Sequence, residues 1–230
     1  MVSGYLLRAC YTEAMRILLA STNEGKVKEL RQILREQGID LVGLGDSEST
    51  EEIETGSTFA ENALLKARHY HRISGLPTIA DDSGLEVKAL GGAPGVQSAR
   101  YAGAGASDAE RVAKLLGEMT GLRWESRAAR FVCAAAIVWG GAERVFTGEA
   151  LGIVLDEPRG HNGFGYDPIF YYEPLGKTFA ELTPAEKAEV SHRGQAFRQL
   201  ARWLDGAVEL DTPGSSDKIN LPTGESSASS

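Results

Sequence analysis

The sequence predicts an α/β protein whose elongated, mixed β-sheet is flanked by helices and divided into two lobes. Two observations predict this fold class. The chain opens with a short apolar run, an amphipathic segment and a second apolar run, which is the strand, helix, strand order of α/β proteins. Its second half contains two long apolar or alternating runs that meet at Gly140 and Gly141, a pattern typical of a β-hairpin. We therefore expect both parallel and antiparallel pairing.

The composition limits the classes of function. The 230 residues carry a net charge of -8, which argues against a general nucleic-acid binder because such affinity depends on Lys and Arg. No apolar run approaches the roughly 18 residues that a membrane span needs. The two cysteines, Cys10 and Cys133, do not form a disulfide framework, so we expect a cytoplasmic protein. Cys133 lies in an apolar run and is expected to be a packed thiol.

A single two-lobed domain is expected over residues 15–206. Residues 1–14 form an N-terminal extension whose apolar piece is too short for a secretory signal, and Met15 is an alternative translation start. Residues 207–230 are expected to form a polar, disordered tail. This expectation rests on residues 212–230, which contain 12 Gly, Pro, Ser or Thr among 19.

The opening of the domain predicts a strand over residues 16–20, a helix that runs from Glu24 to a stop at Gly38, and a strand over residues 39–42. The apolar face of the helix contains Val27, Leu30, Ile33 and Leu34.

Residues 21–26, between this strand and helix, have two interpretations. Hydroxyls, a glycine and Lys26 at a helix N-terminus suit phosphate binding, because the macrodipole and the lysine both attract an anion. Ser21 and Glu24 also match an ordinary capping box, which local sequence favours. The segment lacks the glycines and the ending of a Walker A loop.

A second helix is expected after the polar loop over residues 43–56, since Thr58 and Glu61 match a capping box. Its apolar side contains Phe59, Ala63, Leu64 and Ala67. Glu54 precedes this helix and Lys66 lies within it. Taken alone, Glu54 is a partner for the helix dipole and Lys66 is a solvated side chain.

Asp81 and Asp82 follow the apolar run over residues 76–80, and we expect this strand to end at the two acids. Ligands gather at the carboxyl ends of strands in open α/β sheets, so paired carboxylates there indicate a metal site. A solvated turn explains the two acids equally well on local grounds.

The second half of the chain contains a turn-rich loop over residues 91–95 and a helix capped by Ser107. Glycines surround Phe164, which suits a flat ligand stacking on its ring, although Phe164 and Tyr166 also suit a core position in a tight loop. Thr183 caps a helix that carries Lys187. The last helix opens with Ser191, His192 and Arg193 and is expected to end near Asp205. The pair His192 and Arg193 has two interpretations: both residues are structural, or both donate hydrogen bonds to an oxygen-rich base edge.

In order and spacing, these segments closely resemble the inosine triphosphate pyrophosphatase family, the group of dITP/XTP pyrophosphatases that remove non-standard purine nucleotides. The resemblance covers roughly residues 16–205. The matching stretches are residues 20–26, 54–66, 79–101, 163–170 and 181–195. The most specific are residues 79–85 with 91–95, and residues 164–167 with 191–193.

This resemblance implies a Mg²⁺-dependent hydrolase that cleaves ITP, dITP, XTP or dXTP into the monophosphate and pyrophosphate, with its active site in the cleft between the lobes. It implies that Asp82 is the proton acceptor and a metal ligand, that Glu54 is the second metal ligand, and that Asp81 lies close by. The implied phosphate-binding residues are Ser21, Thr22, Asn23, Glu24, Gly25, Lys26 and Lys66. The implied nucleoside pocket contains Ser83, Phe164, Gly165, Tyr166, Asp167, Lys187, His192 and Arg193. The resemblance also implies a homodimer.

Residue chemistry agrees with these roles. Mg²⁺ prefers carboxylate and phosphate oxygens, and a carboxylate beside a water can accept its proton. Donors such as His192 and Arg193 would pair with the six-oxygen of hypoxanthine and mispair with the amino group of adenine. Two alternatives remain at this stage. One is a related metal-dependent pyrophosphatase for modified pyrimidine or ordinary triphosphates, and the other is a nucleotide-binding regulator without turnover.

Overall fold

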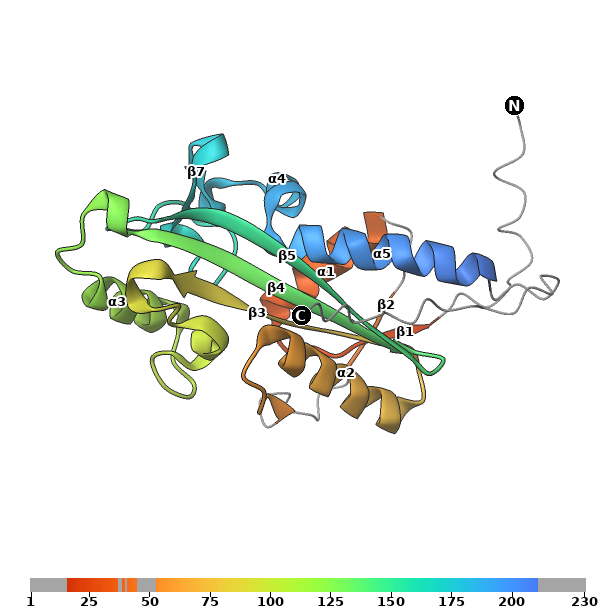
Figure 1. Cartoon of the computed structure of the whole chain (residues 1–230). Coiled ribbons are helices and arrows are strands. Elements are labelled where there is room, and N and C mark those ends of the chain that lie inside the picture. The colour runs from red at the N-terminus through yellow and green to blue at the C-terminus, as the bar shows by residue number, and fades with distance from the viewer. Residues whose placement is uncertain (1–15, 37–38, 40, 45–52, 211–230) are drawn as a thin grey trace, which may run out of the picture.

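The computed structural model describes residues 16–36, 39, 41–44 and 53–210. These residues form a seven-stranded mixed sheet in the order β2-β1-β3-β4-β5-β6-β7 (Figure 1). The strands are β1 (Ile17–Leu19), β2 (Leu41–Gly43), β3 (Thr78–Val87), β4 (Ala128–Trp139), β5 (Ala142–Val154), β6 (Phe170–Tyr172) and β7 (Lys177–Thr178). The helices are α1 (Glu24–Glu36), α2 (Phe59–Ser74), α3 (Asp108–Glu118), α4 (Pro184–Val190) and α5 (His192–Leu210). No helix in this part of the chain is both long and apolar enough to cross a bilayer.

The sheet changes from parallel to antiparallel at β3, which confirms the predicted mixed sheet. Strand β1 pairs in parallel with β2 and with the start of β3, whereas β3, β4, β5, β6 and β7 pair antiparallel in succession. The predicted hairpin is also confirmed: β4 and β5 pair along their whole length, and Gly140 and Gly141 take the positive φ angles that their tight turn requires.

The expectation that a strand ends at Asp81 and Asp82 is wrong. Strand β3 continues through both acids to Val87, because β4 supplies an antiparallel partner opposite Asp81 at Ala135 and opposite Asp82 at Ala134. On the other side of β3, pairing with β1 stops at Ile79. The two acids therefore lie just beyond the carboxyl end of β1, where the chain turns into α1.

Each face of the sheet is covered by helices at this end (Figure 1). Helices α1 and α5 pack on one face, in a core that includes Leu30, Phe197 and Ile79. Helix α2 packs on the opposite face, in a core that includes Tyr70 and Ala80. Ile79 and Ala80 are neighbours in different cores because successive strand residues point to opposite faces.

The second lobe is built around its own core at the other end of the long strands. Leu85 of β3, Leu115 of α3, Phe131 of β4 and Phe179 are buried together there. Helix α3 lies at this end, away from α2 and α5 (Figure 1). The two lobes therefore share β3, β4 and β5, as expected for an elongated sheet.

The predicted helix starts are mostly confirmed. Capping boxes are present at Thr58, Ser107 and Thr183. The predicted Ser21 cap is wrong: α1 begins at Glu24, and Asn23 Oδ1 accepts a hydrogen bond from Lys26 N at 3.0 Å. Helix α5 continues to Leu210, past the predicted end near Asp205. The expectations for residues 1–14 and for the tail over residues 211–230 lie outside the described residues.

Candidate active site

The acids of β3 point to opposite faces of the sheet, as the alternation of strand side chains requires. Asp81 faces α1 and α5, where its Oδ2 atom lies 3.3 Å from Lys26 Nζ and 3.5 Å from Arg193 Nε. Asp82 faces α2, where its Oδ2 atom accepts a hydrogen bond of 3.0 Å from Asn62 Nδ2. Adjacent residues thus enter two different environments.

Asp81 is completely buried and remains a carboxylate. Burial raises the pKa of Asp81, but the positive charges of Lys26, Arg193 and Lys66 outweigh it and hold the pKa at about 2. The same pairing acts on Lys26: burial lowers its pKa, while Asp81 and Asp82 raise it by more, so the net direction is upward. Asp81 therefore anchors Lys26 and Arg193 as charged groups.

Asp82 has the opposite titration behaviour. Burial raises the pKa of Asp82 above the usual value, Lys26 and Lys66 oppose that rise, and the charge of Glu54 adds to it. Its other oxygen, Oδ1, accepts a 2.9 Å hydrogen bond from Ser83 N. A carboxylate with a raised pKa is better suited than Asp81 to take up a proton near neutral pH.

Glu54 and Lys66 form a buried ion pair beside Asp82. Lys66 Nζ lies 2.6 Å from Glu54 Oε1, and Arg100 Nη1 lies 3.7 Å from Glu54 Oε2. Lys66 is only 3% exposed, so the expectation of a solvated lysine is wrong. The sequence pattern failed here because Lys66 lies on the face of α2 that packs against the sheet, one turn after Asn62.

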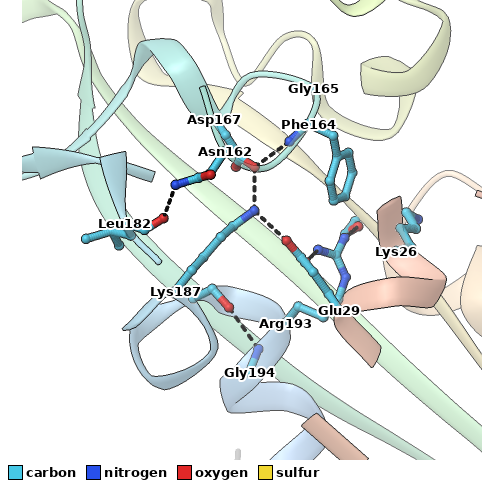
Figure 2. A network of polar contacts seen from close by, with 12 residues as sticks. Lys26, Glu29, Asn162, Phe164, Gly165, Asp167, Leu182, Lys187, Arg193 and Gly194 are labelled. Atoms are coloured by element: carbon cyan, nitrogen blue, oxygen red, sulfur yellow. Dashed lines mark hydrogen bonds and ion pairs between the residues drawn. The ribbon is translucent and has the colours of Figure 1, made fainter. Parts of the chain in front are cut away.

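A second set of charges alternates in sign from Asp167 in the second lobe to Lys26 in α1 (Figure 2). Lys187 Nζ bonds to Asp167 Oδ2 and lies 2.6 Å from Glu29 Oε1. Glu29 Oε2 in turn lies 2.5 Å from Arg193 Nη1, and Arg193 contacts Asp81. We call this set the ion-pair chain; its members are Asp167, Lys187, Glu29, Arg193, Asp81 and Lys26.

The ion-pair chain keeps Lys187 and Glu29 charged, whereas burial raises the pKa of Asp167 at its end. Burial lowers the pKa of Lys187, but Asp167 and Glu29 raise it by more. Burial raises the pKa of Glu29, but Arg193 and Lys187 reverse the direction and lower it. Lys187 has three N–H donors and uses two on Glu29 and Asp167; within the part of the chain that the structure describes, one donor remains for a ligand.

Phe164 sits at the pocket side of this chain (Figure 2). Lys187 Nζ lies 5.1 Å from the centre of its ring, and the guanidinium carbon of Arg193 lies 5.5 Å from it. A Cβ atom at Gly25 would lie 2.7 Å from the Phe164 ring, so α1 approaches this ring closely only because residue 25 is a glycine. Phe164 N also donates a 2.9 Å hydrogen bond to Asp167 Oδ2. This hydrogen bond connects the loop that carries Phe164 to the ion-pair chain.

The two aromatic residues of this loop have different environments. Phe164 is partly exposed at the pocket, whereas Tyr166 is 4% exposed and belongs to the core of the second lobe. The Tyr166 hydroxyl donates to Ser98 O at 3.0 Å. The core interpretation is thus correct for Tyr166, and the ligand-stacking interpretation stays open for Phe164.

His192 is buried against the ring of Phe131, at 4.6 Å between centroids and 8° between planes. Burial lowers the pKa of His192 well below its usual value, and the charges of Arg193, Lys187 and Lys26 lower it further. His192 is therefore a neutral imidazole at neutral pH. Among the described residues, its Nδ1 atom has no hydrogen-bond partner.

A pocket that is open to solvent lies beside Phe164 and the ion-pair chain. Most of the predicted binding residues line it, namely Asn23, Lys26, Ser83, Phe164, Gly165, Tyr166, Asp167, Lys187, His192 and Arg193. Lys26 lines the pocket and also pairs with Asp81. The negative charges of Asp82 and Glu54 help to raise the pKa of Lys26. Ser21 is buried behind this position, whereas Thr22 and Glu24 are exposed. Eight of the predicted site residues are not among the described residues that line the pocket, namely Ser21, Thr22, Glu24, Gly25, Glu54, Lys66, Asp81 and Asp82.

Sequence reasoning missed three residues of the site. Glu29 bridges Lys187 and Arg193, Asn62 binds Asp82, and Asp108 Oδ2 accepts a 2.6 Å hydrogen bond from Gly165 N. Each is a polar residue in an amphipathic helix, where solvation is the usual expectation. The one available signal was the i, i+4 spacing of Asn62 and Lys66, which places them on one face of α2.

Asp82 and Glu54 are suited to hold a divalent cation. Glu54 contributes to the raised pKa of Asp82, so the two negative charges interact, and a cation would relieve their repulsion. No group of three or more His, Cys, Asp or Glu side chains with a metal-binding arrangement occurs in the described part of the chain. Mg²⁺ does not require one, because it usually takes one or two carboxylates together with phosphates and water.

The two lobes share one sheet, and the pocket combines an aromatic ring with buried cations beside carboxylates. These features are typical of α/β proteins that hold a small anionic, aromatic ligand. The Ham1 family profile matches residues 17–203, and the chain belongs to this family. The resemblance inferred from the sequence motifs is thereby confirmed.

Relatives of known name are similar over most of their length. The dITP/XTP pyrophosphatase of Yersinia pseudotuberculosis is 50% identical over 84% of this chain and 99% of its own. The dITP/XTP pyrophosphatase of Thermus thermophilus is 50% identical over 84% of this chain and 93% of its own. The solved structure of the Staphylococcus aureus Ham1 protein has a TM-score of 0.73 and 41% identity, covering 84% of this chain and 99% of that one. The Coxiella burnetii HAM1 protein has a TM-score of 0.72 and 44% identity over the same shares.

Proposed function

We propose that this chain is a Mg²⁺-dependent pyrophosphatase that hydrolyses ITP, dITP, XTP and dXTP to the monophosphate and pyrophosphate. It would thereby keep deaminated purines out of DNA and RNA. The observation that carries the proposal is the ion-pair chain, which connects the donors around the Phe164 ring to Asp81 and Lys26, next to Asp82 in strand β3. The names of the relatives at about 50% identity support the same activity.

Residues 21–26 and Lys66 are proposed to hold the triphosphate. Lys66 provides a buried positive charge and Lys26 a partly buried one, and the N-terminus of α1 adds the favourable end of the helix dipole. Such cations stabilise the charge that develops on the leaving pyrophosphate. The ion pairs to Asp81 and Glu54 keep these lysines in place before the substrate arrives.

Asp82 and Glu54 are proposed to hold Mg²⁺. Bound there, the ion would supply Lewis-acid polarisation of the phosphate oxygens. Asp82 would accept the proton of the attacking water, since it is the more basic of the two adjacent carboxylates in the metal-free protein. Asp81, with a pKa of about 2, would remain a charged anchor for Lys26 and Arg193.

Lys187, His192 and Arg193 are proposed to select the base while Phe164 stacks on it. Lys187 and Arg193 act only as donors, so they pair with the six-oxygen of hypoxanthine or xanthine and mispair with the amino group of adenine. Guanine shares that oxygen, and its rejection is proposed to depend on a steric or unpaired-donor penalty at its two-amino group. Equal turnover of GTP and ITP would refute this penalty.

Pyrophosphate release from ITP, dITP, XTP, dTTP, ATP and GTP, measured with and without Mg²⁺, tests the proposal. We expect release from the first three substrates only, and only with Mg²⁺. Preference for dTTP or an ordinary triphosphate would support a pyrophosphatase of different specificity. Absence of release from every substrate would leave a binding protein without turnover, and orthophosphate as the product would place the cleaved bond elsewhere.

The roles of Asp82 are tested by Asp82→Asn, which preserves size and removes the negative charge and the proton acceptor. We expect a folded protein whose kcat is lower by at least about 1,000-fold. Near-normal kcat would show that Asp82 is not the base. The matched control is Asp205→Asn, at an exposed residue of α5, where kcat should not change.

The cytoplasmic location and the homodimer stay predictions that accompany this function. Light scattering of the purified protein tests the homodimer, and cell fractionation tests the location. Intact mass of the native protein tests whether translation begins at Met15 rather than Met1.

A further inference from the structure

Asn62 connects the two carboxylates that are proposed to hold the metal. Its side chain is completely buried, on the face of α2 that packs against β3. Its Nδ2 atom donates to Asp82 Oδ2 at 3.0 Å, and its Oδ1 atom accepts from Gly56 N at 2.7 Å. Gly56 lies two residues after Glu54, so one amide group holds both Asp82 and the backbone next to Glu54.

The orientation of this amide is determined by its partners. Gly56 N–H is a donor only and a carboxylate is an acceptor only, so the carbonyl oxygen must face Gly56 and the NH₂ group must face Asp82. Asp82 Oδ1 is already fixed by Ser83 N at 2.9 Å. Each oxygen of Asp82 therefore has one fixed donor, and the plane of the carboxylate cannot rotate without losing one of them.

Gly56 supports the same geometry through close packing. A Cβ atom at this residue would lie 2.8 Å from Asn62 Oδ1 and 2.7 Å from the Cβ atom of Glu61. The backbone after Glu54 can thus reach the Asn62 amide only when residue 56 is a glycine. A larger residue at position 56 would displace Asn62 without changing any polar group of the site.

We infer that Asn62 is a positioning residue for the hydrolytic reaction, which orients the Asp82 carboxylate and fixes it relative to the backbone that carries Glu54. The inference rests on the proposed function, in which Asp82 is the base. Asn62 does not contact the substrate in this account; it acts through Asp82. Loss of its bond should therefore reduce kcat and leave KM almost unchanged, because the groups around Phe164 and Lys187 are unaffected.

The test uses the full chain with Asn62→Leu, which removes both hydrogen bonds at similar volume. We expect kcat at saturating Mg²⁺ to fall about 10- to 100-fold, as for loss of a hydrogen bond to a charged group, with KM within about threefold of wild type. Asn62→Asp keeps the acceptor for Gly56 N–H but places a second carboxylate against Asp82, and kcat should fall in the same way. Gly56→Ala should also lower kcat, although it keeps the side-chain amide of Asn62.

Hydrogen exchange without substrate or metal gives an independent readout. The amide of Gly56 should exchange faster in Asn62→Leu, which lacks the acceptor, and remain protected in Asn62→Asp. The matched control is Glu61→Ala, which removes the carboxylate that accepts hydrogen bonds from Ser57 N and Thr58 N at the exposed start of α2. Its melting temperature should fall while its kcat stays at the wild-type value.

Two outcomes would overturn the inference. One is wild-type kcat in folded Asn62→Leu and Asn62→Asp; the other is a fall in melting temperature equal to that of Glu61→Ala with no change in kcat. Asp82→Asn, measured in parallel, separates this failure from a failure of the proposed function. If Asp82→Asn is inactive while the Asn62 variants are normal, only the role of Asn62 is wrong. If Asp82→Asn is active, the proposed role of Asp82 is wrong.

Discussion

Asp81 and Asp82 are adjacent in the chain, yet Asp81 lies 3.3 Å from Lys26 on the α1 face of the sheet and Asp82 lies 3.0 Å from Asn62 on the α2 face. Strand geometry alone causes this separation, because neighbouring side chains in β3 point in opposite directions. The two acids consequently differ in pKa direction: that of Asp81 is lowered and that of Asp82 is raised. One acid is suited to anchor cations, and the other to take up a proton.

Asp81→Asn should destabilise the folded protein. The substitution removes the negative charge between the partly buried Lys26 and the buried Arg193, and breaking a buried ion pair on one side costs about 3–5 kcal/mol. Urea denaturation at neutral pH should show this loss in the free energy of unfolding. Asp205→Asn, at an exposed residue of α5, is the control and should change that free energy by less than about 0.5 kcal/mol. Equal stability of the two variants would contradict the anchoring role of Asp81.

His192 should make the folded protein less stable as the pH falls below neutral. Its folded pKa lies well below the unfolded value of 6.5, so the unfolded state takes up a proton first. Its contribution to stability is complete above about pH 6.5 and is lost at up to about 1.4 kcal/mol per pH unit below it. Urea denaturation of wild type and His192→Phe between pH 8 and pH 5 should show a smaller slope in the variant. The control His161→Gln, at an exposed histidine, should retain the wild-type slope.

Glu29→Gln should weaken base selection more than catalysis. Glu29 holds Lys187 at 2.6 Å and Arg193 at 2.5 Å, and the neutral amide would leave both cations without their shared counter-charge. We expect the ratio of kcat/KM for ITP over ATP to fall by about tenfold or more. Lys28→Gln, at an exposed residue of the same helix, should leave the ratio unchanged. An unchanged ratio in Glu29→Gln would show that Glu29 is needed only for folding.

Gly25→Ala should displace Phe164 and lower kcat/KM for ITP. The new methyl group would lie 2.7 Å from the Phe164 ring, which must move, and loss of base stacking costs about 1–3 kcal/mol. We expect kcat/KM to fall about 5- to 100-fold. The helix itself should not weaken, because Ala is favoured over Gly in a helix by about 1 kcal/mol. Gly206→Ala in α5, where a Cβ atom meets no neighbour, is the control and should keep wild-type kcat/KM.

Features that depend on near neighbours in the chain were predictable from sequence. The capping boxes at Thr58 and Thr183 were found because their hydrogen bonds join residues three positions apart. The hairpin at Gly140 was found because its turn needs positive φ angles. The local rule failed at Ser21, where Asn23, one residue before α1, supplies the cap instead.

The mixed α/β class, the position of the hairpin and most of the residues that line the pocket could be predicted from the sequence. The partners of those residues became known only from the fold. It extended β3 through Asp81 and Asp82, buried Lys66 against Glu54, and brought Glu29 and Asn62 into the site. The physical reason is that burial and ion pairing depend on contacts between segments far apart in the chain, as in Arg193 with Asp81, whereas periodicity and capping report only on near neighbours.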